Sequence, residues 1–263
     1  MLRVLILGGT GDAAELTARI NNITEIEAIA SLAGRTREPV APVGNVRVGG
    51  FGGVTGLVEY LKHQKIDVLI DATHPFANHI SWNAAAAATQ MGIPRLLVNR
   101  PPWEKQPGDI WIEVENNTEA AAALENQALE NQALEHQLFK HQIKRVFLTI
   151  GRQEISAFSH LQKMWFLMRM IDPPVADVVI PPGLMLLDRG PFTLEDEREI
   201  LTKYNIDTIV SKNSGGNATY PKIIAAREMG IKVVMVKRPP VPPGEQVSDV
   251  ESAVKWLLEK VGT

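Results

Sequence analysis

The start of the chain constrains the fold most, because it reads as a buried strand, a glycine turn and a helix. Val4 to Leu7 are apolar and partly β-branched, which is typical of a strand buried on both faces of a parallel sheet. The turn Gly8-Gly9-Thr10-Gly11 ends this strand, and apolar residues then recur at helical spacing from Asp12 to Asn21. Further strands are expected at 26–31, 68–70 and 96–98, with an alanine-rich helix at 83–91. This alternation predicts an α/β fold with parallel sheets.

The sequence also repeats itself in order along the chain. Four segments have later counterparts: 3–7 and 145–149, 66–70 and 206–210, 91–93 and 229–231, and 97–102 and 235–240. We therefore expect an internal duplication, with two Rossmann-like halves and the active site in the cleft between them. Residues 1–124 are the expected dinucleotide-binding domain, and residues 144–263 the expected second domain, on the substrate side. The alternative is that similar strands occur in any α/β protein.

A low-complexity segment separates the two halves. Ala123 to Gln137 consists of the pentads ALENQ, ALENQ and ALEHQ, whose residues favour a helix. A five-residue step does not match the helical period, so the leucines spiral around the helix instead of forming one stripe. We expect a helical bridge at 125–143 that extends a surface helix. A partner-binding helix is the alternative.

Composition excludes several kinds of site. The chain has no cysteine, which excludes disulfides, thiolate metal sites and cysteine nucleophiles. Its 27 basic and 30 acidic residues give a net charge of -3, so nucleic-acid binding is not expected. No signal peptide or membrane-spanning stretch is evident, and we expect a cytoplasmic protein. No metal site is expected, because His74 and His79 have no cysteine nearby, and the sequence does not indicate an oligomeric state.

The first glycine turn is the strongest indication of function. Residues 9–14 fit the pattern G-x-G-x-x-A, directly after a strand and at the start of a helix. Gly9 and Gly11 would let the backbone approach a pyrophosphate, and the amides at the helix N-terminus would hold its charge. Together with Thr10 and Asp12, they predict a dinucleotide site. A tight turn without a ligand is the alternative.

The end of the second strand bears on which dinucleotide is bound. NAD sites usually place an acidic residue there, which binds the ribose 2′-hydroxyl. This chain instead has Ser31, Gly34, Arg35 and Arg37, and arginines suit a 2′-phosphate. We therefore predict NADPH, with NADH as the alternative, unless the two arginines are only solvated surface residues. The cluster Gly49-Gly50-Phe51-Gly52-Gly53 either borders the cofactor or is a plain connector.

Polar residues follow the strands at the edge where parallel sheets bind ligands. Thr73 and His74 follow the strand at 68–70, and His74 could transfer a proton or merely cap a turn. In the second copy, the loop 211–219 is rich in hydrogen-bond donors and Lys222 follows it. This loop could bind carboxylates or the nicotinamide carboxamide, or it could simply cap the start of a helix. Three arginines follow expected strands in this copy: Arg152, Arg169 and Arg189. Together they suggest an acidic substrate; the alternative is that each forms a separate surface ion pair.

Several motifs together carry a family resemblance along nearly the whole chain. They are LILGGTGDAAEL, GGFGG, DATHPFA, RPPW, GRQEISAF, RMIDPP, RGPFTLEDE and VSKNSGG, followed by Thr219, Lys222 and Ala225 to Arg227. In this ordered set the chain resembles the precorrin-6A reductases of cobalamin biosynthesis, in both the metal-free and the cobalt-containing pathways. The pentad segment is not part of the family pattern.

The resemblance implies an NAD(P)H-dependent reduction of one macrocycle double bond, which converts precorrin-6A to precorrin-6B. It places Gly9 to Asp12 in the cofactor turn, and Ser31, Gly34 and Arg35 near the adenosine ribose. Five residues would flank the cleft where nicotinamide meets macrocycle: Thr73, His74, Lys212, Ser214 and Gly215. His74 is the candidate proton donor, and Lys212 is a second candidate catalytic residue. The implied substrate is a polycarboxylate tetrapyrrole, in agreement with the candidate substrate-binding residues Arg152, Arg169, Arg189 and Lys222.

Two other functions remain open from the sequence. A short-chain-type NADP-dependent reductase would need a Y-x-x-x-K motif, and no tyrosine of this chain has a lysine four residues later. A non-catalytic NADPH sensor would bind a partner through the pentad helix.

Overall fold

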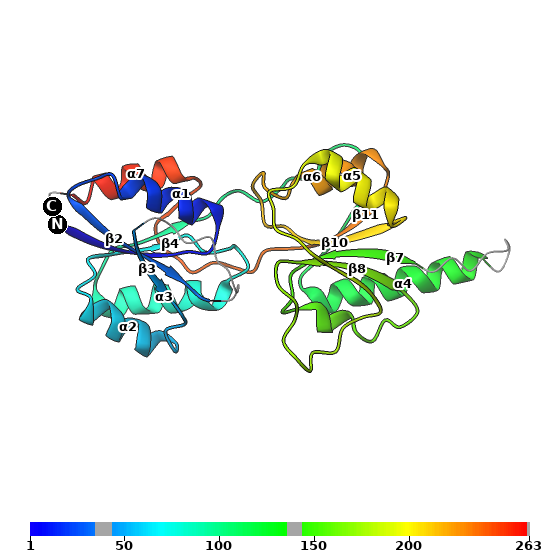
Figure 1. Cartoon of the computed structure of the whole chain (residues 1–263), viewed down its shortest axis with the longest axis horizontal. Helices are drawn as coiled ribbons and strands as arrows, with labels where there is room; N and C mark the ends of the chain where they lie inside the picture. Colours follow the sequence, from blue (N-terminus) through cyan, green and yellow to red (C-terminus); the bar gives the residue numbers. More distant parts are fainter. Residues whose placement is uncertain (35–43, 136–143, 262–263) are drawn as a thin grey trace. The chain divides into compact units, whose positions relative to one another are not determined.

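The structure is a computed structural model that describes residues 1–34, 44–135 and 144–261 (Figure 1). The chain forms two compact units. The first unit contains Met1–Pro101 and Pro239–Thr263, and the second unit contains Pro102–Arg238. Within the described residues, no helix has the length and apolar character needed to cross a lipid bilayer.

The first unit is a parallel six-stranded sheet with helices on both faces. The strand order is β12-β5-β4-β1-β2-β3, which is the order of a dinucleotide-binding α/β sheet. The strands are β1 (Leu2–Leu7), β2 (Ile26–Leu32), β3 (Asn45–Val48), β4 (Val68–Asp71), β5 (Arg95–Val98) and β12 (Gln246–Val247). Figure 1 shows α1 (Gly11–Ile20) and α7 (Val250–Leu258) over one face, and α2 (Val54–His63) and α3 (Asn78–Met91) over the other.

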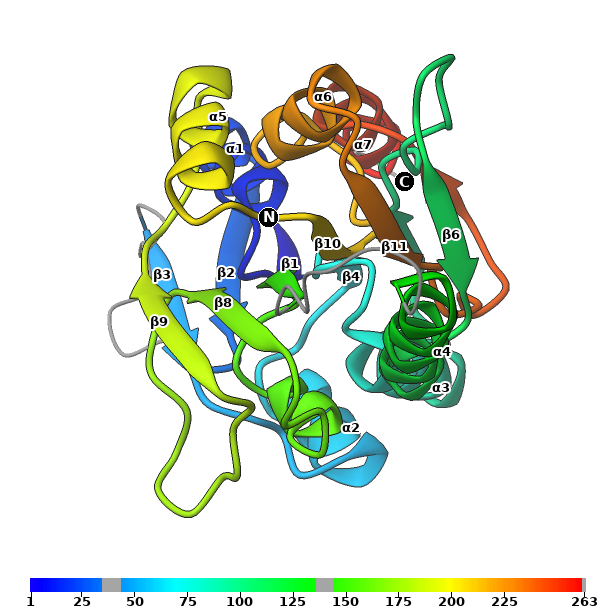
Figure 2. The same cartoon turned by 90° about the vertical axis from the view of Figure 1, so that its right-hand side faces the viewer.

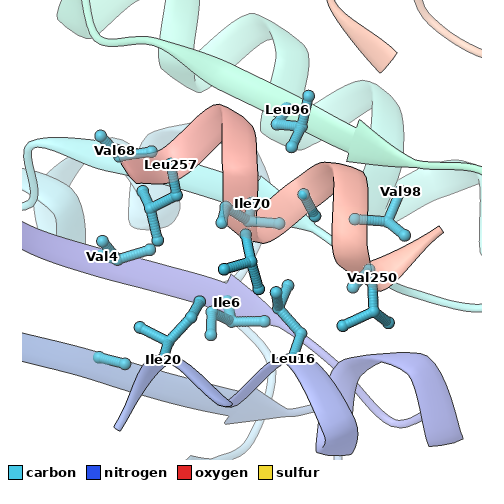
Figure 3. Close-up of a cluster of buried hydrophobic side chains, with 14 of the residues drawn as sticks. Val4, Ile6, Leu16, Ile20, Val68, Ile70, Leu96, Val98, Val250 and Leu257 are labelled. Carbon is cyan, nitrogen blue, oxygen red and sulfur yellow. The ribbon is translucent and has the colours of Figure 1, made fainter. Parts of the chain in front are cut away.

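The apolar run in β1 supplies the core on both faces of this sheet. Because successive side chains of a strand point to opposite faces, Val4 and Ile6 pack toward α1 and α7, as Figure 3 shows. Leu5 and Leu7 pack toward α2 and α3. All four side chains are essentially inaccessible to solvent, which explains why the strand is uniformly apolar rather than alternating.

The second unit has the same architecture. Its strand order is β6-β11-β10-β7-β8-β9, and all of its neighbouring strands are parallel. The strands are β6 (Trp111–Val114), β7 (Arg145–Thr149), β8 (Trp165–Met170), β9 (Gly183–Leu187), β10 (Thr208–Lys212) and β11 (Lys232–Val236). The helices are α4 (Asn117–Glu135), the short 3-10 helix η1 (Ile155–Phe158), α5 (Leu194–Lys203) and α6 (Pro221–Glu228). The expected α/β fold with two parallel sheets is therefore confirmed.

The domain boundaries expected at 124 and 144 differ from those of the structure. Strands β1 to β5 correspond in order to β7 to β11, but each copy gives its sixth strand to the other sheet. Strand β6 pairs with β11 of the second unit, as Figure 2 shows, and β12 pairs with β5 of the first unit. Helices α4 and α7 follow these strands. The expected boundaries followed the sequence repeat. The boundaries of the units depend instead on which sheet each strand joins by hydrogen bonding.

The described part of the expected helical bridge, residues 125–135, belongs to α4. This helix runs from Asn117 to Glu135 and so includes most of the pentad segment. Ala120, Ala121 and Leu124 are buried, which anchors the start of the helix in the second unit. The rest of the expected bridge, residues 136–143, lies outside the described residues.

Candidate functional site

The first unit contains an open cavity of about 420 Å³, within the usual size range of small-molecule sites. It lies at the carboxyl ends of β1, β2 and β4, next to the point where the strand order reverses. Its lining is rich in glycine and apolar groups, with a few polar side chains: Leu7, Gly8, Gly9, Ser31, Leu32, Ala33, Gly34, Gly49, Gly50, Phe51, Gly52, Gly53, Thr73, His74, Ala77, His79, Ile80 and Asn83.

The glycine turn beside this cavity is held by one threonine. Thr10 caps α1: its hydroxyl accepts a hydrogen bond from the Ala13 amide at 3.1 Å. The same hydroxyl donates to the carbonyl oxygen of Ala72 at 2.8 Å, which joins the turn to the end of β4. Gly9 has a φ of +107°, a conformation that favours glycine. The turn is thus fixed before any ligand binds.

The first turn of α1 carries an acid whose charge is balanced. Asp12 forms an ion pair of 2.6 Å with Arg100, which follows β5. Amides at a helix N-terminus precede the first intrahelical hydrogen bond, and the helix dipole favours an anion there. Because Arg100 offsets the charge of Asp12, this helix N-terminus remains suitable for a phosphate.

The end of β2 is organised by an arginine that the sequence did not single out. Ser31 lines the cavity, is almost fully buried, and accepts a hydrogen bond from Nη1 of Arg47 at 3.2 Å. Gly34 also lines the cavity. Arg35 and Arg37, the candidate ligands of a 2′-phosphate, lie outside the described residues. The only signal for Arg47 in the sequence was a basic residue two positions before the glycine cluster.

The loop after β4 brings two candidate residues to the cavity. Thr73 donates its hydroxyl to Oδ1 of the fully buried Asp71 at 2.7 Å, and its amide donates to the same atom at 3.1 Å. His74 is exposed, and its Nδ1 accepts a hydrogen bond from the Phe76 amide at 3.2 Å. In the neutral imidazole the proton is therefore on Nε2. His74 thus both caps the turn and presents an N–H group.

In the second unit, the candidate residues after β10 lie in an ordered loop. Lys212 ends β10 and forms an ion pair with Glu154, which also accepts a hydrogen bond from Asn117 at 3.0 Å. Ser214 is buried, and its amide donates to the Lys212 carbonyl at 2.8 Å. Gly215 has a φ of +65°. These residues lie at the carboxyl edge of the second sheet, as expected.

Trp103 covers this loop. Its amide donates to Oδ1 of Asn213 at 2.7 Å, and its indole N–H donates to the Gly216 carbonyl at 2.9 Å. Asn213 in turn donates its side-chain amide to the Trp103 carbonyl at 2.9 Å. The RPPW and VSKNSGG motifs therefore pack against each other, a role in folding that the sequence did not indicate.

Two of the four candidate substrate-binding residues are buried in this structure. Arg169 is 6% exposed and forms an ion pair of 2.7 Å with Glu197, and its guanidinium stacks 3.6 Å from the ring of Phe192. Lys222 is 3% exposed, and its ammonium donates to the Thr219 carbonyl at 3.1 Å. Both cations make their contacts within the interior of the second unit.

Burial changes the chemistry of Lys222. Desolvation lowers the pKa of its ammonium group to about 7, with a smaller contribution from Arg169, while Glu197 acts in the opposite direction. The other two candidates remain accessible. Arg189 is exposed, and Arg152 is half-buried and donates to the Pro173 carbonyl at 3.0 Å. In the described ranges, no group of three or more histidine or acidic side chains could hold a metal ion.

Comparisons with known proteins agree on one family. The family model described as precorrin-6x reductase CbiJ/CobK matches residues 3–258. The precorrin-6A reductase of Rhodococcus erythropolis is 46% identical over 259 residues, which cover 98% of each chain. The precorrin-6A reductase of Rhodobacter capsulatus is 38% identical over 263 residues, which cover 100% of this chain and 98% of that protein.

A solved structure gives the same result for the fold. The structure of CobK precorrin-6A reductase is similar to this one with a TM-score of 0.86 and 38% identity, covering 98% of this chain and 97% of that chain. The sequence similarity over nearly the full length and the shared fold therefore indicate the same family as the sequence motifs do. The chain belongs to the precorrin-6x reductase family, CbiJ/CobK, a family of oxidoreductases.

Proposed function

We propose that the chain reduces precorrin-6A to precorrin-6B in cobalamin biosynthesis and takes its hydride from NADPH. The observation that carries this proposal is the cavity at the carboxyl ends of β1, β2 and β4, in a chain of this reductase family. The glycine turn contributes Gly8 and Gly9 to the cavity lining, and the N-terminus of α1 follows directly in the sequence. In a sheet with the Rossmann strand order, this is the arrangement that binds dinucleotides.

The residues present fit a dinucleotide. The glycines of the turn and of loop 49–53 leave room along the backbone, and the amides at the start of α1 suit the pyrophosphate. A reduced nicotinamide bound there supplies the hydride. Thr73 and His74 lie on the β4 side of the cavity, where they would border the reacting end of the cofactor.

The preference for NADPH rests on the end of β2. Its last described residues, Ser31 to Gly34, include no acid that could bind a ribose 2′-hydroxyl. Ser31 receives a hydrogen bond from Arg47, and Arg35 and Arg37 follow in the sequence. We assign these two arginines to the 2′-phosphate, because guanidinium groups form paired hydrogen bonds with phosphate oxygens.

The proton has two candidate donors. His74 lines the cavity, and with Nδ1 occupied by the Phe76 amide its neutral ring carries the proton on Nε2, as a general acid would require. Lys212 carries an ammonium group at the carboxyl edge of the second sheet, held by Glu154. We assign the protonation step to His74 and an orienting role to Lys212. Ser214 and Gly215 lie beside Lys212 and would contact the cofactor or the macrocycle.

The substrate carries many carboxylates, and Arg152 and Arg189 are the accessible cations assigned to them. Both follow strands of the second sheet at its carboxyl edge: Arg152 comes after β7, and Arg189 comes after β9. An exposed arginine can form paired hydrogen bonds with a carboxylate. Arg169 and Lys222 support this edge from within the unit, without touching the substrate.

Turnover with each cofactor tests the proposal. Purified protein is mixed with precorrin-6A and either NADPH or NADH, and nicotinamide absorbance and macrocycle spectrum are followed together. The expected result is consumption of NADPH in step with the loss of precorrin-6A. The double variant Arg35→Ala/Arg37→Ala should lower the preference for NADPH over NADH by about tenfold or more. Failure of the wild-type protein to bind either nucleotide would refute the proposal.

A further inference from the structure

Arg47 lies on the edge strand β3, directly beside Ser31 of β2 in the register of the sheet. Residues paired in this way project to the same face, so its guanidinium reaches the serine hydroxyl at 3.2 Å. Ser31 lines the cavity, whereas Arg47 is not among the lining residues. The arginine therefore acts on the cavity through other residues.

The same guanidinium holds the glycine loop 49–53. Nη1 donates to the Gly49 carbonyl at 2.5 Å, and Nη2 donates to the Gly50 carbonyl at 2.7 Å. Its Cζ atom lies 3.7 Å from the ring centre of Phe51 and 5.0 Å from that of Tyr60. Arginine can make these contacts because its guanidinium is a planar fork of donors that also packs against aromatic faces. The ammonium group of lysine has no such planar fork.

This loop needs an anchor because glycines make it costly to order. Gly49, Gly52 and Gly53 have φ values of +126°, +78° and +98°, and all five residues of the loop line the cavity. Glycine loses more conformational freedom on ordering than any other residue. An unanchored loop of this composition would have to become ordered when the ligand binds, which weakens binding.

Gly56 allows loop 49–53 to pack closely against α2. A Cβ at Gly56, in the first turns of α2, would lie 1.8 Å from the Phe51 carbonyl oxygen. Only glycine allows the loop to fold back this closely on the helix. The loop is therefore held from two sides: by Arg47 on β3, and by close packing on α2.

We propose that Arg47 is a positioning residue of the cofactor site. It holds Ser31 and loop 49–53 as a preformed wall of the cavity, while its charge is directed to backbone carbonyls. This inference rests on the proposed binding of a nicotinamide dinucleotide in the cavity. It separates two roles for basic residues: Arg47 shapes the site for any nicotinamide dinucleotide, and Arg35 and Arg37 select the 2′-phosphate.

The test compares cofactor affinity in Arg47→Ala and Arg47→Lys with that of the wild-type protein, by calorimetric titration with NADPH and with NADH. Arg47→Ala should raise both dissociation constants by about tenfold, with their ratio unchanged within about twofold. Arg47→Lys should retain the charge but lose the paired hydrogen bonds, and should weaken both cofactors nearly as much. In turnover, the KM for cofactor should rise while kcat at saturating cofactor stays close to that of the wild-type protein.

Arg145 offers a matched control. It also lies on a strand, donates to a backbone carbonyl (that of Tyr204, at 2.6 Å) and lies over an aromatic ring (Trp165, at 4.0 Å), but it belongs to the second unit. Arg145→Lys should alter thermal stability to a similar extent and leave both cofactor affinities unchanged. Hydrogen exchange of the unliganded protein should show faster exchange at 49–53 in the Arg47 variants only.

The outcomes distinguish a failure of the positioning role of Arg47 from a failure of the proposed cofactor binding. Loss of NADPH affinity alone would show that Arg47 binds the 2′-phosphate directly, and would overturn the positioning role. Unchanged affinity for both cofactors would overturn it as well. If Arg47→Ala does not fold, the affinities of Arg47→Lys for NADPH and NADH are compared in the same way. If the wild-type protein binds neither nucleotide, the proposed function itself fails, independently of Arg47.

Discussion

The hydroxyl of Thr10 bridges two loops of the first sheet: it donates to the Ala72 carbonyl at 2.8 Å and accepts from the Ala13 amide. The bridge fixes the glycine turn after β1 against the end of β4, on both sides of the point where the strand order reverses. A single side chain thus serves as helix cap and as a tie between the two loops that border the candidate cofactor site.

Removal of this bridge should weaken both stability and cofactor binding. Thr10→Val keeps the shape of the side chain but loses the helix cap and the hydrogen bond to Ala72, so we expect a loss of about 1–2 kcal/mol in the free energy of unfolding. Cofactor affinity should fall in the same variant. Thr10→Ser retains the hydroxyl and should behave like the wild-type protein in chemical denaturation and titration. Equal stability of the Val and Ser variants would contradict the bridge.

Two glycines of the turn should differ in the effect of an added methyl group. At Gly11 a Cβ meets no atom within 4 Å, so Gly11→Ala should leave the free energy of unfolding unchanged or raise it by up to about 1 kcal/mol. Cofactor affinity should nevertheless fall, because the methyl group occupies space that a pyrophosphate needs. Gly9 has a φ of +107°, and Gly9→Ala should destabilise the fold by about 1 kcal/mol or more. Full cofactor affinity in Gly11→Ala would argue against a phosphate at this turn.

Proton donation by His74 can be tested separately from its role in capping the turn. His74→Asn offers an oxygen to the Phe76 amide in place of Nδ1, but removes the proton on Nε2. If His74 donates the proton, kcat should fall by about 10²-fold or more while cofactor affinity is retained. The exposed His160, in the second unit, provides the control His160→Asn, which should keep full activity. An unchanged kcat in His74→Asn would transfer the protonation step to another group.

Lys222 should make stability dependent on pH. Burial lowers its pKa to about 7 in the folded state, whereas the pKa of an unfolded lysine is about 10.4. Between these values the unfolded chain binds more protons, so the free energy of unfolding should rise from pH 7 toward pH 10. Lys222→Met removes this contribution, so it should stabilise the protein more at pH 6 than at pH 9. Denaturation curves at the two pH values test this, and an equal effect at both would contradict it.

Much of the first unit could be predicted from the sequence because its signals are local. The apolar run of β1, the glycine turn and the helix that follows are contiguous, and the structure has β1 at Leu2–Leu7 and α1 at Gly11–Ile20. Parallel sheets place the carboxyl ends of their strands at one edge, so Gly9, Ser31, Thr73 and His74 could be assigned to one site from their positions after strands.

What could not be predicted depends on contacts between distant residues. The pairing of β6 with β11 and of β12 with β5 leaves no local signal, and the domain boundaries were therefore misplaced. A buried arginine and an exposed one look the same in sequence, because both are charged and follow strands. Contacts such as that of Glu197 with Arg169 and that of the Trp103 ring with Lys222 show that these two cations lie in the interior.

Isotope labelling shows whether the hydride of NADPH reaches precorrin-6A. Precorrin-6A is incubated with the wild-type protein and NADPH that carries deuterium at the transferable position of the nicotinamide, and the product is analysed by mass spectrometry. We expect a product heavier than the substrate by one deuterium and one hydrogen, the hydrogen being replaced by a second deuterium when the reaction runs in deuterated water. A product without deuterium from NADPH, or no product at all, would contradict this expectation.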